Sequence, residues 1–168
     1  GFMLTSAVLS MWISNTATTL MLLPIAMAII TSMNSPKLAA ALLLGIAYSA
    51  SLGGVGTPIG TPPNIIFMSV YQQTTGTELS FINWMITGVP IVLIAIPIMA
   101  FWLTRKLSDM PDCDLPKAGD WRPAEKRVLI VFGIVALAWI FRPYWSVWTG
   151  MTLVSDSTIA IAGVVLMF

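Results

Sequence analysis

The sequence predicts an all-α polytopic membrane protein, and the prediction rests on its composition and on the spacing of its charges. Of its 168 residues, 57% are hydrophobic and only 9% are charged, whereas a soluble domain carries roughly a quarter charged residues. No charged side chain occurs in residues 1–36, 38–77 or 79–104. Each of these stretches exceeds the roughly 20 apolar residues that cross a bilayer once, so we expect several crossings.

The first apolar block, residues 1–33, is predicted to form a re-entrant helical hairpin. The polar tripeptide Ser14-Asn15-Thr16 divides it into residues 2–13 and 18–31, each short for a full crossing. Such a break survives at membrane depth only where protein or a water-filled cavity surrounds it. We expect Ser14 or Asn15 to cap the second half-helix, and residues 34–37 to form the closing turn.

Residues 38–73 are predicted to form one broken transmembrane helix. Four glycines and three prolines lie between residues 53 and 64, and such a stretch cannot continue a regular helix. Thr61 followed by two prolines indicates the cap and first turn of a second half-helix. Its N-terminus would favour an anion, and the carbonyls freed at residues 56–60 would face a cation. Close packing of Gly56 and Gly60 alone does not explain the three prolines.

The remaining chain predicts a further crossing, a linker and two more helices. Residues 84–104 form the crossing, with Pro90 and Pro97 as kinks. A hydrophilic linker follows at residues 105–123, and a helix begins near Ala124. A polar-aromatic loop at residues 142–156 would separate it from a last helix that starts at Ser157. Both ends of the chain lie in apolar runs, so we expect a piece of a longer protein.

The basic residues predict the orientation in the membrane. Six of the eight lie in or beside the linker, and Lys37 follows the hairpin. Alternating crossings place both regions on one side, which the positive-inside rule makes cytoplasmic. The six are Arg105, Lys106, Lys117, Arg122, Lys126 and Arg127. Aromatic residues near segment ends fit an interfacial belt; these are Trp84, Trp102, Tyr144, Trp145 and Trp148. We expect a multi-pass protein of a bacterial inner membrane.

Several classes of function are disfavoured. The sequence has no histidine, and Cys113 is its only cysteine, so it offers neither the commonest catalytic base nor a disulfide framework. An intramembrane enzyme that used Ser14 or Thr16 would need an activating base, and the helical segments offer none. The basic residues lie in a loop rather than on a face, so we expect no nucleic-acid partner.

The two interrupted segments together point to a binding site. Hydroxyls in membrane helices commonly bond to the carbonyl four residues earlier, which would account for Ser10 and Thr18. Asn15 cannot satisfy its amide so simply. Paired interrupted helices mark the binding site of secondary transporters, and neutral oxygen ligands suit a monovalent cation such as Na⁺. Neither segment carries a charged side chain, so the substrate's own charge would balance the ion.

The same residues carry a family resemblance. Ser14-Asn15-Thr16 resembles the Ser-Asn-Thr signature of the divalent anion/sodium symporter (DASS) family, and Gly60-Thr61-Pro62-Pro63-Asn64 resembles its partner motif at the following helix break. The resemblance implies Na⁺-coupled symport of a C4-dicarboxylate such as succinate, or of citrate or sulfate. It also implies two inverted repeats, an elevator-type transport domain and a homodimer.

By position, the resemblance implies roles for seven residues and for three stretches. Residues 1–104 would be transport-domain elements of the first repeat, 105–123 the cytoplasmic linker, and 124–168 the first helices of the second repeat. The Na⁺ ligands would be Ser10, Ser14, Asn15 and Gly60, and the substrate would contact Asn15, Thr16, Thr61 and Pro62.

The chain has no second Ser-Asn-Thr motif and no second broken helix. It would therefore hold about half of such a site and not transport alone. A cation/proton antiporter, an arsenite carrier and a membrane bundle without a ligand remain alternatives, as do symport and exchange.

Overall fold

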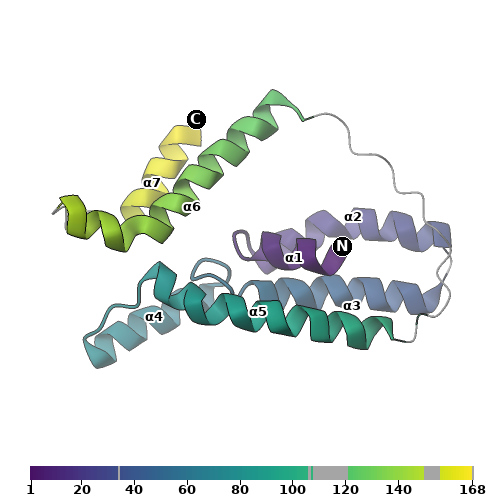
Figure 1. The fold of residues 1–168 in the computed structure, drawn as a ribbon. Helices are drawn as coiled ribbons and strands as arrows, with labels where there is room; N and C mark the ends of the chain where they lie inside the picture. The colour runs from purple at the N-terminus through teal and green to yellow at the C-terminus, as the bar shows by residue number, and fades with distance from the viewer. Residues whose placement is uncertain (34, 106, 108–120, 150–155, 168) are drawn as a thin grey trace. The chain divides into compact units, whose positions relative to one another are not determined.

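The computed structural model describes residues 1–33, 35–105, 107, 121–149 and 156–167. In this part of the chain there are seven α-helices and no strand (Figure 1), which confirms the all-α prediction. The chain divides into two compact units. The first comprises Gly1–Leu79 and Asn83–Asp114, and the second comprises Ser80–Ile82 and Leu115–Phe168.

A helical hairpin opens the first unit. Helix α1 spans Phe2–Ser10, and α2 spans Asn15–Met33. The turn between them lies at residues 11–14, and Ser14 caps α2 because its Oγ accepts the N–H of Ala17 at 3.2 Å. Asn15 and Thr16 therefore begin α2 rather than interrupt the block, and the predicted position of the break was wrong by about three residues.

The two arms of this hairpin differ in length. Helix α1 has only 9 residues, as expected for a half-helix. Helix α2 has 19 residues and is long and apolar enough to cross a membrane. The prediction that both arms are short is therefore wrong for α2, since the helix takes in Asn15 at its start and continues through Pro24 to Met33.

The predicted broken helix is present as α3 and α4. Helix α3 spans Pro36–Gly53, with the Ser35 Oγ accepting the N–H of Leu38 at 3.4 Å. Helix α4 spans Pro62–Thr75 and ends at Gly76, whose φ of 71° is left-handed. We call residues 54–61, which join the two helices without helical structure, the link. Thr61 is the N-cap residue of α4, as predicted, although its side chain makes no capping hydrogen bond.

Small residues bring α1 close to α3. A methyl group added at Gly53 would overlap the backbone of Ala7, so the helices touch there at backbone distance. The Ser6 hydroxyl also donates to the Ile46 carbonyl of α3 at 3.0 Å. Ala7 packs with two residues of α5, Val92 and Ile96. A second buried cluster joins α2 to α3 and comprises Leu22, Ala26 and Ile46.

Helix α5, Phe81–Thr104, runs alongside α3 in Figure 1 and continues through Pro90 and Pro97. Its large apolar side chains face mostly outward; Phe101 is 72% exposed, as expected for a surface that meets lipid. Among the described residues, three helices are long and apolar enough to span a membrane, namely α2, α3 and α5. This finding confirms a polytopic membrane architecture.

The second unit contains α6, Pro123–Thr149, and α7, Asp156–Met167. They pack together at Gly163, where an added methyl group would lie 2.6 Å from Val135 Cγ2. The predicted loop at residues 142–156 is wrong in its first half, because α6 continues to residue 149. Aromatic residues there are compatible with a helix, and the first glycine after Gly133 is Gly150. Cys113 and most of the predicted linker lie outside the described residues.

Candidate functional site

The hairpin and the link meet at Gly54. A methyl group added there would lie 2.6 Å from Asn15 Oδ1 and 2.6 Å from Thr61 Cγ2. The Ser10 hydroxyl donates to the same Asn15 Oδ1 at 2.6 Å. Ser10, Asn15 and Thr61, three of the predicted site residues, are therefore gathered around one glycine.

Gly60, a fourth predicted site residue, joins this group through its backbone. An added methyl group at Gly60 would overlap the Gly54 carbonyl oxygen and lie 2.8 Å from Gly54 Cα. The two ends of the link thus touch at a pair of glycines. A side chain at Gly60 would push it away from Gly54, and one at Gly54 would meet Asn15 and Thr61. These close contacts give the glycine-rich composition of the link a structural reason.

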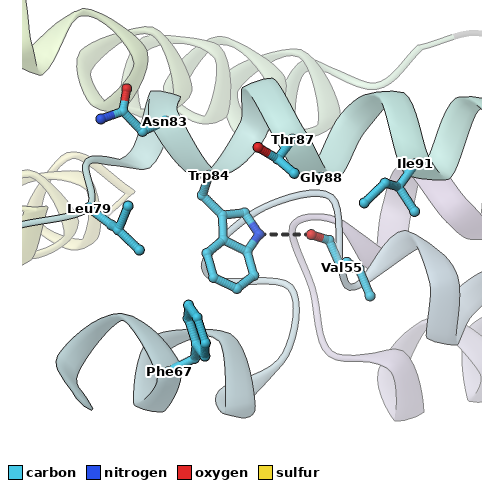
Figure 2. Close-up of a pocket in the computed structure, with 8 residues that line it drawn as sticks. All are labelled: Val55, Phe67, Leu79, Asn83, Trp84, Thr87, Gly88 and Ile91. Atoms are coloured by element: carbon cyan, nitrogen blue, oxygen red, sulfur yellow. Dashed lines mark hydrogen bonds between the residues drawn. The ribbon is translucent and has the colours of Figure 1, made fainter. Parts of the chain in front are cut away.

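Three polar side chains from different elements hold the link in place. Asn64 of α4 is 8% exposed, and its Nδ2 donates to the carbonyls of Gly54 at 2.8 Å and Thr57 at 2.9 Å. The Thr57 hydroxyl donates to the Met11 carbonyl at the hairpin turn. Trp84 of α5 donates its indole N–H to the Val55 carbonyl at 2.8 Å (Figure 2).

None of these three residues was among the predicted site residues. Trp84 was assigned to an interfacial belt, but it is partly buried and bonded to the link. One signal was available: the carbonyls freed by a helix break need donors, and a buried amide or indole supplies them.

Other oxygens of the link are left available. The carbonyl oxygens of Gly56, Ile59 and Gly60 accept no hydrogen bond from the part of the chain that the structure describes. Within the same residues there is no group of three or more His, Cys, Asp or Glu that could hold a metal ion. Because residues 1–36 and 38–77 carry no charged side chain, the hairpin and the link offer a cation only neutral oxygen ligands.

The remaining predicted residues lie beside this group. The Ser14 hydroxyl serves as the α2 cap, and Thr16 follows Asn15 at an exposed position in the first turn. Pro62 is exposed at the start of α4. No contact joins Thr16 or Pro62 to Ser10, Asn15 or Thr61 among the hydrogen bonds of the described chain.

Two expectations about local hydroxyl bonds were wrong. Ser10 donates to Asn15 rather than to the carbonyl four residues earlier. Thr18 is fully buried, and its Oγ1 has no hydrogen-bond partner in the described part of the chain. By contrast, Ser49 and Thr31 do donate to the fourth residue before them. The sequence pattern does not tell which hydroxyls bond to the carbonyl four residues earlier and which do not.

The electrostatics of the site come from dipoles rather than from charged side chains. Helix α2 begins at Asn15 and α4 begins at Pro62, so two helix N-termini, each with a partial positive charge, flank Gly54. The sequence predicted both helix starts but expected only the second to favour an anion. Neutral oxygens and two positive helix ends in one place provide partners for a cation and for an anion.

Apolar spans with two helix breaks that meet are typical of secondary membrane transporters. Residues 1–168, the whole chain, match the family described as citrate transporter (CitMHS), and the chain belongs to this family. Over its full length it is 38% identical to the sodium-dependent dicarboxylate transporter SdcS of Staphylococcus saprophyticus and 36% identical to SdcS of Staphylococcus aureus. The chain spans 37% of the length of each relative.

These matches confirm the family resemblance that the two motifs indicated. The family is one of transporters rather than enzymes. Its bacterial relatives and the three apolar helices place the chain in a multi-pass protein of a bacterial plasma membrane.

Proposed function

We propose that this chain is part of a Na⁺-coupled symporter for a divalent carboxylate, most simply a C4-dicarboxylate such as succinate. The observation that supports the proposal best is the meeting of Asn15 and Thr61 at Gly54. It joins the two motifs at a site that has no charged side chain. The relatives' names, sodium-dependent dicarboxylate transporters, agree with this ion and this substrate class.

In the proposed site, one Na⁺ is held by Ser10, Ser14 and Asn15 of the hairpin and by the carbonyl of Gly60. Ser10 Oγ and Asn15 Oδ1 are 2.6 Å apart, close enough for both oxygens to contact one cation. The Ser10 hydroxyl hydrogen would rotate away from Asn15 when the ion binds. The Gly60 carbonyl is free to take part, because it accepts no hydrogen bond from the described residues.

The substrate carboxylate is proposed to lie against the two helix N-termini. Asn15 accepts through Oδ1, which leaves its Nδ2 donors for a carboxylate. The Thr61 hydroxyl makes no capping bond and supplies another donor, while Thr16 and Pro62 line the same edge. One amide would then contact ion and substrate at once, so binding of each would favour binding of the other.

The coupling also has an electrostatic reason. A dianion is costly to move into a low-dielectric site without compensating charge, and the site residues offer only dipoles. The Na⁺ would supply that charge. We propose that the remaining ligands come from the rest of the full-length protein, which works as a homodimer with an elevator-type motion, and that residues 105–123 form its cytoplasmic linker.

Uptake by the full-length protein in proteoliposomes tests the proposal. Radiolabelled succinate should accumulate with an inward Na⁺ gradient and not with K⁺ in its place. Asn15→Ala should abolish this uptake while the protein still inserts in the membrane. Citrate and sulfate as competitors assign the anion; inhibition by citrate alone would move the substrate to a tricarboxylate.

Two other outcomes would contradict the proposal. Wild-type uptake by Asn15→Ala would remove the assignment of the site. A ligand-free bundle predicts that neither Na⁺ nor succinate raises the melting temperature, whereas a ligand that binds the native state raises it with concentration.

A further inference from the structure

Two residues of α5 converge on a single carbonyl of the link. The Trp84 indole N–H donates to the Val55 oxygen at 2.8 Å. A methyl group added at Gly88 would lie 2.6 Å from the same oxygen and 3.1 Å from the Gly56 oxygen. Trp84 and Gly88 are four residues apart and share one face of the helix. Figure 2 shows the indole directed at Val55, with Gly88 on the next turn of α5.

The position of Val55 in the link makes this contact important for the site. Its neighbour Gly54 touches Asn15 and Thr61, and its other neighbour is Gly56. Glycine has wide backbone freedom, so a peptide plane between two glycines is poorly fixed by the chain itself. The bond to Trp84 holds the Val55 carbonyl toward α5 and thereby fixes the plane next to Gly54.

We propose that Trp84 and Gly88 are positioning residues for Na⁺ binding, and this proposal rests on the proposed function. They keep the link in the shape that brings Gly60 against Gly54 and Gly54 against Asn15. Without the indole N–H, the Val55 carbonyl lacks a donor and the link gains other conformations. The oxygens that would hold the ion are then less well prearranged, and the apparent affinity for Na⁺ falls.

The surroundings of Trp84 allow its N–H to be tested apart from its bulk. The ring meets Phe67 of α4 edge-on, with centroids 5.8 Å apart. It also borders an open pocket of about 280 Å³, whose lining includes Val55, Phe67 and Ile91. Trp84→Phe keeps an aromatic ring against Phe67 and removes the indole N–H. Because the ring already borders an open pocket, the smaller ring creates no new enclosed cavity, and the main loss is the hydrogen bond to Val55.

The experiment measures uptake by the full-length protein in proteoliposomes as a function of Na⁺ and of succinate. Trp84→Phe and Gly88→Ala should each raise the Na⁺ concentration for half-maximal uptake by about fivefold, the effect of one typical hydrogen bond. The succinate KM at saturating Na⁺ should stay within about twofold, because the substrate contacts are unchanged. The double variant should show little more than the larger single effect, since both changes act on the same carbonyl.

Trp102→Phe is the matched control. Trp102 lies on the same helix, is 61% exposed and stacks under Arg105, whose Cζ lies 5.0 Å from the ring centroid. It should behave like the wild type. If Gly88→Ala is absent from the membrane, Trp84→Phe decides the question alone.

An unchanged Na⁺ requirement in Trp84→Phe would overturn the positioning role. A rise in succinate KM equal to the rise in the Na⁺ requirement would do so as well, because it would indicate general loosening. Failure of the proposed function looks different: the wild type itself would then take up succinate equally well without Na⁺.

Discussion

Gly54 offers the sharpest test of the candidate site, because it lies where the two motifs touch. Gly54→Ala adds one methyl group at 2.6 Å from Asn15 Oδ1 and 2.6 Å from Thr61 Cγ2, well inside an ordinary van der Waals contact. The backbone at Gly54 has φ −57° and ψ −19°, which alanine adopts without strain. The expected effect therefore comes from displacement of Asn15 and Thr61 and not from the backbone.

The magnitude follows from the cost of overpacking. Forcing an extra methyl group into a closely packed site costs about 1–3 kcal/mol. If that cost falls on the bound state, the affinities for Na⁺ and succinate decrease by about 5- to 150-fold. Uptake kinetics and the stabilisation of the full-length protein by Na⁺ and succinate in thermal melts measure both affinities.

Gly45→Ala, on the preceding helix α3, is the matched control. Its added methyl group would lie 3.1 Å from Met3 Cγ, and a methionine side chain adapts easily. We expect near-wild-type uptake from this variant. If Gly54→Ala also retained wild-type affinities for both ligands, the contact of Asn15 and Thr61 at Gly54 could not be part of the binding site.

Three further predictions concern residues around the link. Asn64→Ala should lower the free energy of unfolding by about 2–3 kcal/mol, because it leaves the buried carbonyls of Gly54 and Thr57 without their shared donor; a melting temperature equal to that of the wild type would contradict this. Thr18→Val should stabilise the protein by about 1 kcal/mol, since it removes a buried hydroxyl without a partner in the described chain, and a destabilised variant would indicate a partner elsewhere in the full-length protein. Thr61→Val should weaken succinate binding more than Na⁺ binding, because the Thr61 hydroxyl makes no capping bond; equal losses in isothermal titrations with each ligand would argue against substrate contact.

The composition and the positions of glycine, proline and polar residues were enough to predict the helical architecture but not the helix ends. The polar residues Ser14 and Asn15 look alike as helix breakers, yet Ser14 caps α2 while Asn15 lies within it and accepts from Ser10. Which of two adjacent polar residues leaves the helix depends on their partners in the fold. The same holds for residues 142–149, where aromatic composition resembled a loop but the chain continues as α6.

Only some residues of the candidate site could be predicted from the sequence. The motif residues Asn15 and Thr61 could be singled out from sequence because they interrupt apolar spans. Asn64, whose partners lie 10 and 7 residues before it, belongs to the second motif as well. Thr57 and Trp84 could not be singled out, since their bonds join residues 46 and 29 apart in the chain. No local pattern encodes such contacts. They become visible only when the fold brings α5 and the hairpin turn to the link.

The way the link is held bears on how the proposed coupling would work. Asn64, Thr57 and Trp84 fix it through hydrogen bonds with backbone carbonyls, and none of the three is among the proposed ligands. Of the proposed side-chain ligands, Ser14 accepts the Ala17 N–H through its hydroxyl oxygen. Within the described residues, only the bond from Ser10 to Asn15 joins one ligand to another. Na⁺ binding would therefore exchange that bond for ion contacts and leave the link nearly unchanged. Because Asn15 Oδ1 would pass from Ser10 to the ion while its Nδ2 contacts the substrate, this one side chain would couple the two ligands.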